Sequence, residues 1–98
     1  MNIIKSLDGT TLNVALEGRL DTTTAPQLEA ELKQSIADNT ELILDFAKLE
    51  YISSAGLRVL LAAQKVMNKQ GKMVIRNVND VILEVFEVTG FVDILTVE

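Results

Sequence analysis

The chain has 98 residues, of which 48% are hydrophobic, and this length fits one domain, residues 1–98, with one modest core. It contains neither cysteine nor histidine, which excludes disulfides, thiolate metal sites and a histidine general base. Its net charge of −5 disfavours a phosphate backbone as partner, so we expect no nucleic acid partner.

Two strands joined by a tight turn are predicted at the N-terminus. Ile3–Leu7 is the first strand, and the pair Asp8-Gly9 is typical of a hairpin turn. Apolar and polar residues alternate in Thr10–Glu17, which predicts a strand with one buried and one wetter face.

A polar loop and a first helix follow. Gly18–Thr24 is predicted as the loop, and Thr24 with Gln27 fits a capping box at the start of the helix. An apolar stripe at helical spacing continues until Asp38-Asn39 breaks the pattern. The stripe consists of Leu28, Leu32 and Ile36.

The next strand and helix are separated by a short predicted loop. Glu41–Phe46 is the strand, and either Ser53 or Ser54 caps a helix that reaches about Lys69. Gly71 is the expected stop of that helix.

The C-terminal part predicts a strand, a helix and a last strand. Lys72–Asn77 is the strand, Asn79 or Asp80 caps a helix through about Thr89, and Phe91–Val97 contains the last strand. The element order is therefore β-β-α-β-α-β-α-β, which predicts an α/β fold. Its sheet is mostly parallel with an antiparallel N-terminal strand, and right-handed crossovers place the helices on one face.

No segment predicts export or membrane insertion. The N-terminal residues 1–6 lack the apolar core of a secretory signal, and no apolar run approaches the ~18–20 residues that span a bilayer. We expect a soluble cytoplasmic domain without direct membrane insertion.

The residues of a catalytic site are missing. A Ser-His-Asp triad is impossible without histidine, and around Ser54 only the trailing Gly56 matches a nucleophile elbow. No phosphate-binding or dinucleotide-binding glycine pattern occurs, and no carboxylates have metal-ligand spacing. We predict that the protein is not an enzyme and has no metal and no cofactor.

The two adjacent serines, Ser53 and Ser54, are the most informative feature of the chain. They stand where a strand that ends near Asp45 passes through a loop into a helix N-terminus, which offers free N–H groups and a positive dipole end. Such a place suits a serine that is modified, and simple helix capping is the alternative role.

Two segments carry a resemblance to a known family. Asp45-Phe46 followed by Ile52–Leu57 resembles the core motif of the STAS domain, and Gly18–Asp21 with Thr24-Ala25 resembles its second motif. A weaker third likeness lies at Thr89–Phe91. The chain is thus similar to bacterial anti-sigma factor antagonists, which belong to that family.

The resemblance implies a binding module that is switched by phosphorylation. Unmodified antagonists capture an anti-sigma factor, often itself a serine kinase, and so free a sigma factor for transcription; the kinase then phosphorylates the antagonist and a serine phosphatase resets it. The serine implied as the acceptor is Ser54, with Ser53 as second choice. Ser53 stands where the best-known antagonists often have aspartate, and Ala55 where they often have serine or threonine.

A group of residues around Ser54 is predicted to bind the partner. The resemblance implies that Asp21 flanks Ser54, and the alternative for Asp21 is an Asx turn. Gly56 permits close approach by a partner or close packing within the domain, and Arg58 can pair with a phosphate or a partner carboxylate or remain solvated. The predicted partner-binding residues are Asp21, Thr22, Ser53, Ser54, Ala55, Gly56 and Arg58.

A second class of partner stays open. STAS-like domains also serve as accessory subunits of lipid-transport ATPase complexes or as regulatory parts of anion transporters. The intact Ser-x-Gly segment at Ser54 in a free-standing acidic domain favours the sigma-factor pathway. The identity of the partner distinguishes the two.

Overall fold

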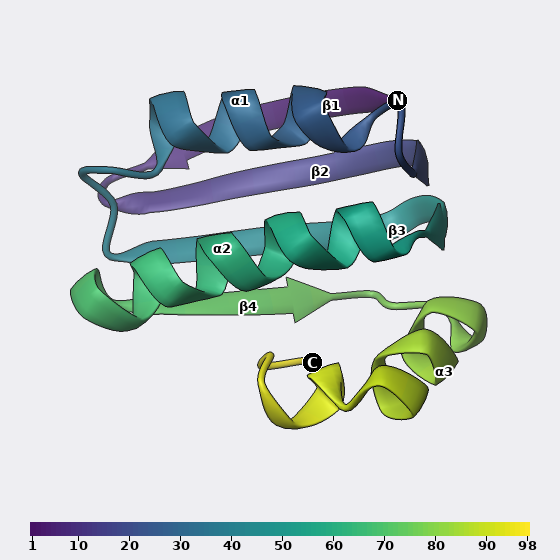
Figure 1. Cartoon of the computed structure of the whole chain (residues 1–98). Helices are drawn as coiled ribbons and strands as arrows, with labels where there is room; N and C mark the ends of the chain where they lie inside the picture. The colour runs from purple at the N-terminus through teal and green to yellow at the C-terminus, as the bar shows by residue number, and fades with distance from the viewer.

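The chain folds into a four-stranded sheet with three helices. A computed structural model describes all residues from 1 to 98. The elements are β1 (Asn2–Asp8), β2 (Thr11–Leu20), α1 (Ala25–Ser35), β3 (Glu41–Ile52), α2 (Ser54–Gln70), β4 (Lys72–Arg76), α3 (Asp80–Thr89) and a short 3-10 helix (Phe91–Asp93). The strand order is β1-β2-β3-β4, with β1 antiparallel to β2 and the other pairs parallel (Figure 1). The predicted α/β fold with a mostly parallel sheet is confirmed.

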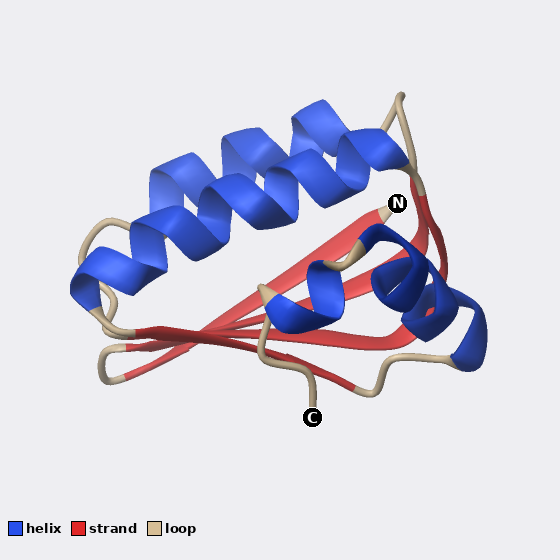
Figure 2. Cartoon of the chain, turned by 60° about the horizontal axis from the view of Figure 1, so that its bottom comes forward, coloured by secondary structure: helices blue, strands red, loops and turns tan.

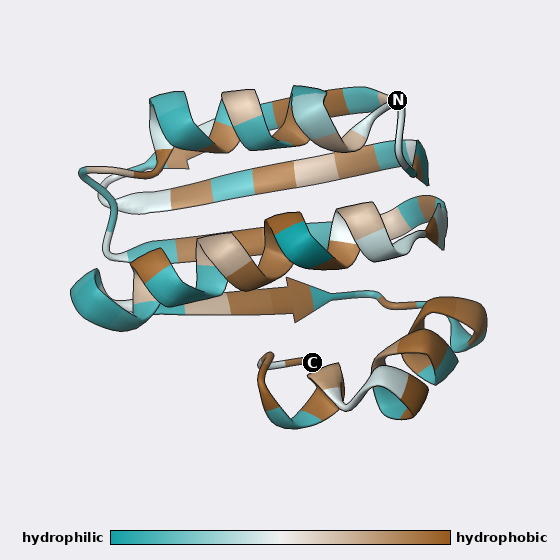
Figure 3. Ribbon diagram, in the orientation of Figure 1, coloured by the Kyte–Doolittle hydropathy of each residue, from teal (hydrophilic) through white to brown (hydrophobic).

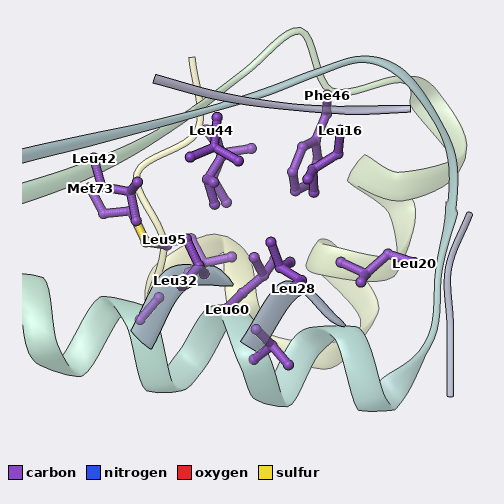
Figure 4. Close-up of a cluster of buried hydrophobic side chains, with 14 of the residues drawn as sticks. Leu16, Leu20, Leu28, Leu32, Leu42, Leu44, Phe46, Leu60, Met73 and Leu95 are labelled. Atoms are coloured by element: carbon purple, nitrogen blue, oxygen red, sulfur yellow. The ribbon is translucent and has the colours of Figure 1, made fainter. Parts of the chain in front are cut away.

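The helices cover one face of the sheet. Figure 2 shows α1 and α2 lying side by side above the strands. The bands of alternating hydropathy along β2 in Figure 3 reflect the predicted period of two, which points Leu12, Val14 and Leu16 into the core. Leu28 and Leu60 lie opposite these strands in the cluster of Figure 4 and are fully buried. No helix of the protein combines the length and the hydropathy needed to cross a membrane.

Strands β2 and β3 are both longer than predicted. β2 continues to Leu20 through a segment predicted as a loop from Gly18, and β3 ends at Ile52 rather than Phe46. The β2–β3 ladder shifts register after Ala15 and again after Gly18. At both shifts the extra residue lies on β3, so each bulge breaks the alternation of inward and outward residues on that strand only. The period of two that predicts a strand is therefore lost where β3 continues, whereas β2 keeps it, with Leu16 and Leu20 both buried.

The longer strands bring two separate turns of the chain together. β2 and β3 are parallel, so both end at the same edge of the sheet. There the amide of Ser53 donates a hydrogen bond to the carbonyl of Leu20 over 2.9 Å. Asp21 and Ser54, each one residue further along the chain, consequently leave the sheet from adjacent points, Asp21 into the loop before α1 and Ser54 into the first turn of α2.

The predicted capping box at the start of α1 is wrong. Thr24 occupies the N-cap position, but its hydroxyl makes no cap bond and its backbone is in the helical region, at φ −102° and ψ −20°. The hydroxyl instead donates to the carbonyl of Arg19 and accepts from the amide of Asp21, both over 2.8 Å. The Gln27 amide donates to the carbonyl of Met1 over 3.4 Å.

The predicted last strand is also wrong. After α3 the chain turns at Gly90, at φ +79°, into the 3-10 helix, and the amides of Ile94 and Leu95 donate to the carbonyl of Phe91. These local bonds use the backbone groups that a strand would need. Only Val97 forms a bridge with the sheet, parallel to Ile75 of β4.

Asp45 on β3 fixes the turn that follows β4. Asn77 has a left-handed backbone, at φ +61°, and its side-chain amide donates to Asp45 Oδ1 over 2.9 Å. The amide of Ala47 donates to the same oxygen over 2.9 Å. The hydrogen bonds from Asn77 and then Ala47 hold the pKa of the Asp45 carboxyl below its usual range.

Replacement of Asp45 by asparagine is therefore expected to flatten the pH dependence of stability. Because the pKa of Asp45 is depressed in the folded state, its stabilising contribution is present above the pKa of the unfolded chain, about 3.9, and is lost as the pH falls through the folded pKa. The gap in unfolding free energy between wild type and Asp45→Asn should be largest near neutral pH and shrink below about pH 4. Urea denaturation at a series of pH values measures this gap, and a gap independent of pH would contradict the assignment.

Candidate functional site

The two serines at the start of α2 have different structural roles. Ser53 is the N-cap, with extended backbone at φ −101° and ψ 175°, and its hydroxyl accepts a hydrogen bond from the amide of Gly56 over 3.5 Å. Ser54 is the first residue of the helix, is exposed, and its hydroxyl has no hydrogen-bond partner in the domain. Of the two serines predicted as candidate caps of this helix, Ser53 is the N-cap in the structure. The hydroxyl of Ser54 is the one left free.

The backbone around Ser54 favours a negative group. The first hydrogen bond of α2 runs from the amide of Leu57 to the carbonyl of Ser53, over 3.0 Å, so the amides before Leu57 have no acceptor within the helix. The first turn of α2 contains no acidic residue that would use the positive end of the helix dipole. A phosphate on Ser54 would therefore stand in a favourable field without a competing carboxylate.

Asp21 forms an Asx turn before α1. Its Oδ1 accepts hydrogen bonds from the amide of Thr23 over 3.0 Å, from the hydroxyl of Thr23 over 2.7 Å and from the amide of Thr24 over 3.2 Å. The Thr23 hydroxyl is the largest cause that holds the pKa of Asp21 below its usual range. The Asx-turn interpretation is confirmed. A contact between Asp21 and a partner stays a prediction.

Gly56 is explained by packing within the domain. It is buried, and a Cβ at this position would lie 2.7 Å from Leu20 Cγ and 2.8 Å from Ile52 Cγ1. The ends of β2 and β3 thus press directly on the first turn of α2. Because Gly56 has no side chain, the first turn of α2 can pack closely against the edge of the sheet, and this packing fixes the position of Ser54.

Three of the predicted partner-binding residues meet at a shallow hollow between the starts of α1 and α2. They are Thr22, Ala55 and Arg58. Thr22 and Arg58 are exposed, and Arg58 is in no ion pair. The hollow is completed by Ala25, Pro26, Glu29 and Val59. Asp21 does not line it.

Arg19 and Tyr51 form a pair near the site that sequence reasoning missed. The guanidinium carbon of Arg19 lies 4.4 Å from the centre of the Tyr51 ring, within the range of a cation–π contact. The two residues are register partners across β2 and β3. Both positions were predicted as loop, so no sequence signal could pair them before the register was known.

The family is shown by comparison with known proteins. The STAS domain family matches residues 2–98, which is nearly the whole chain. The chain belongs to the STAS domain family. A relative from Bordetella bronchiseptica described as the anti-sigma factor antagonist BtrV is 41% identical over 88 residues, covering 88% of this chain and 76% of that protein. The anti-sigma-B factor antagonist of Listeria monocytogenes is 29% identical, covering 100% of this chain and 90% of its own.

Solved structures of STAS proteins share the fold. An anti-sigma factor antagonist from Mycobacterium paratuberculosis superimposes with a TM-score of 0.89 at 22% identity, over 98% of this chain and 83% of that one. The antagonist SpoIIAA in its unphosphorylated form gives 0.78 at 19% identity, over 99% and 87%. The phosphorylated form of SpoIIAA from Bacillus also gives 0.78, at 20% identity, over 99% and 91%. The names of these relatives describe regulatory proteins and not enzymes.

Proposed function

We propose that this protein is an anti-sigma factor antagonist switched by phosphorylation of Ser54. In its unmodified form it binds an anti-sigma factor that is also a serine kinase, and the complex breaks when Ser54 is phosphorylated. A serine phosphatase then restores the binding form. The observation that carries the proposal is the exposed, unbonded hydroxyl of Ser54 at the first position of α2, beside a Ser53 hydroxyl that is engaged as N-cap.

The modification is a phosphoryl transfer from ATP. The Ser54 oxygen attacks the γ-phosphorus of ATP, the bond from that phosphorus to the bridging oxygen breaks, and ADP leaves. The hydroxyl proton passes to a base of the kinase. The antagonist supplies only an accessible nucleophile in a fixed position, which agrees with the lack of a histidine in the chain.

The domain tolerates the product better than an interface does. A phosphate adds roughly −1.5 to −2 charges, and the free amides at the start of α2 offset part of that charge inside the domain. A partner that covers Ser54 would have to bury the part of the phosphate charge that these amides do not offset. Superposition of the chain on both forms of SpoIIAA with the same TM-score supports a switch that keeps the fold.

The acceptor is tested by mapping the phosphate. The chain and its Ser54→Ala and Ser53→Ala variants are incubated with labelled ATP in an extract of the source cell, and the label is located by mass spectrometry. We expect labelling of wild type and Ser53→Ala and none of Ser54→Ala. Circular dichroism checks that each variant is folded, because loss of an N-cap serine costs about 1 kcal/mol. Full labelling of Ser54→Ala would contradict the proposal.

The same extract separates the two classes of partner. An anti-sigma factor predicts capture of a kinase that is released when ATP is added. An accessory subunit of a transporter predicts co-purification with membranes and no modified serine.

A further inference from the structure

Most of the positively charged side chains of the protein are in ion pairs, and the few that are not lie close together. Six of its nine lysines and arginines lie within 4.0 Å of a carboxylate oxygen. The three that do not are Arg58, Lys65 and Lys69, and all three belong to α2. The free positive charge of an acidic protein is thus gathered on one helix.

These three residues lie on the same side of the helix. Their spacing of seven and then four residues aligns them along one face, and all are exposed. Ala62 and Val66, which is 40% exposed, lie next to them. We call Arg58, Lys65 and Lys69 the basic stripe. Figure 2 shows that α2 packs on the sheet from one side only, so its opposite side faces solvent.

Helix stability does not explain the basic stripe. Lys69 is in the last turn, where a cation interacts favourably with the helix dipole, but Arg58 and Lys65 are not. α2 contains no aspartate or glutamate that could pair with them at helical spacing. Lys65 and Lys69 are four residues apart, and like charges at this spacing weaken a helix.

We propose that the basic stripe docks against an acidic surface of the anti-sigma factor. This proposal rests on the function proposed above and names the chemistry of the partner. Ser54 stands one turn before Arg58, at the end of the stripe. A phosphate of roughly −1.5 to −2 charges there offsets much of the three positive charges, so modification weakens both the contact and the long-range attraction.

A protein partner fits the stripe better than nucleic acid does. Proteins that bind DNA through its backbone make about six to ten phosphate contacts, and the stripe offers three cations on a chain of net charge −5. Charge complementarity between proteins mainly raises the rate of association. The stripe should therefore act on the association rate and its dependence on salt.

The test compares two variants of equal charge. The stripe variant carries Arg58→Gln, Lys65→Gln and Lys69→Gln. The control variant carries Lys5→Gln, Lys48→Gln and Lys72→Gln, whose lysines pair with carboxylates away from α2. Each variant changes the net charge from −5 to −8.

Association with the anti-sigma factor, purified on the wild-type chain, is measured by surface plasmon resonance from about 50 to about 500 mM salt. We expect the stripe variant to associate about tenfold more slowly at low salt and the control about as fast as wild type, with the differences fading at high salt. An equal fall in both variants, or no fall in the stripe variant, would overturn the proposal.

A second probe separates this proposal from the proposed function. If the wild-type chain captures no anti-sigma factor, the proposed function fails, and the stripe is tested alone by NMR with an oligoglutamate peptide. Shifts of α2 amides with the peptide that disappear in the stripe variant support an acidic docking surface. A preference for a short DNA duplex or for phosphatidylserine vesicles, or peptide shifts that spare α2, would overturn it.

Discussion

Phosphorylation of Ser54 is expected to lower the affinity for the anti-sigma factor about a thousandfold. An unpaired anion buried in an interface costs several kcal/mol, and about 4 kcal/mol corresponds to that factor in Kd. Ser54 is exposed and unbonded in the domain, so the phosphate displaces no contact that the fold needs. Isothermal titration of the unmodified and phosphorylated chains against the anti-sigma factor measures the change.

Two variants and a stability measurement control that result. Ser54→Asp should weaken binding by a smaller factor, because aspartate carries less charge and fewer oxygens than phosphate. Ser53→Asp places the same carboxylate one residue earlier, where aspartate is as good an N-cap as serine, and should bind more tightly than Ser54→Asp. The thermal unfolding of the phosphorylated chain should stay close to that of the unmodified one. Equal affinity before and after phosphorylation would leave the chain as an adaptor without a switch.

The position of Ser54 could be predicted because its signals are local. A strand, two serines, a glycine and an apolar helical stripe follow one another within residues 41–69, and capping chemistry depends only on neighbours in sequence. The same holds for the hairpin turn and for the start of α3, where Asn79 accepts from the amide of Ile82 over 2.8 Å.

The surroundings of Ser54 could not be predicted in the same way. The hollow that Thr22 and Arg58 share, and the pair of Arg19 with Tyr51, depend on how far β2 and β3 run and in which register. Two register shifts set the positions of these residues, and they interrupt the alternation on β3 that would otherwise reveal how far that strand runs. The capping box predicted at Thr24 does not form because its hydroxyl bonds the carbonyl of Arg19 and the amide of Asp21 instead.

Gly71 is the position at which a single methyl group should damage the fold most. A Cβ there would lie 1.7 Å from the carbonyl oxygen of Thr40 and 2.6 Å from its carbonyl carbon. The obstacle is backbone and cannot rotate away as a side chain can. The sequence suggested a helix stop at Gly71, and the structure shows that the junction between α2 and β4 must pass directly over Thr40.

The segment that contains Thr40 is fixed by several hydrogen bonds, so it cannot move away from Gly71 without a cost in folding free energy. The carbonyl of Thr40 accepts from the amide of Lys72 over 3.0 Å, a bond that starts the pairing of β4 with β3. The side-chain amide of Gln70 donates to the carbonyls of Ile36 and Asn39, over 2.7 and 2.6 Å, and so ties the end of α2 to the end of α1. Moving Thr40 away would strain both connections.

Gly71→Ala is therefore expected to lower the unfolding free energy by at least about 3 kcal/mol, out of the roughly 5–15 kcal/mol of a typical domain. For a chain of this size that corresponds to a fall in Tm of more than about 12 °C. Gly9→Asn is the matched control, because Gly9 has φ +63° with no atom near its missing Cβ, and asparagine tolerates that backbone. Urea denaturation and calorimetry of both variants measure the difference. A Gly71→Ala protein as stable as Gly9→Asn would mean that the contact with Thr40 does not set the junction, and that α2, with Ser54 at its other end, can shift along the sheet.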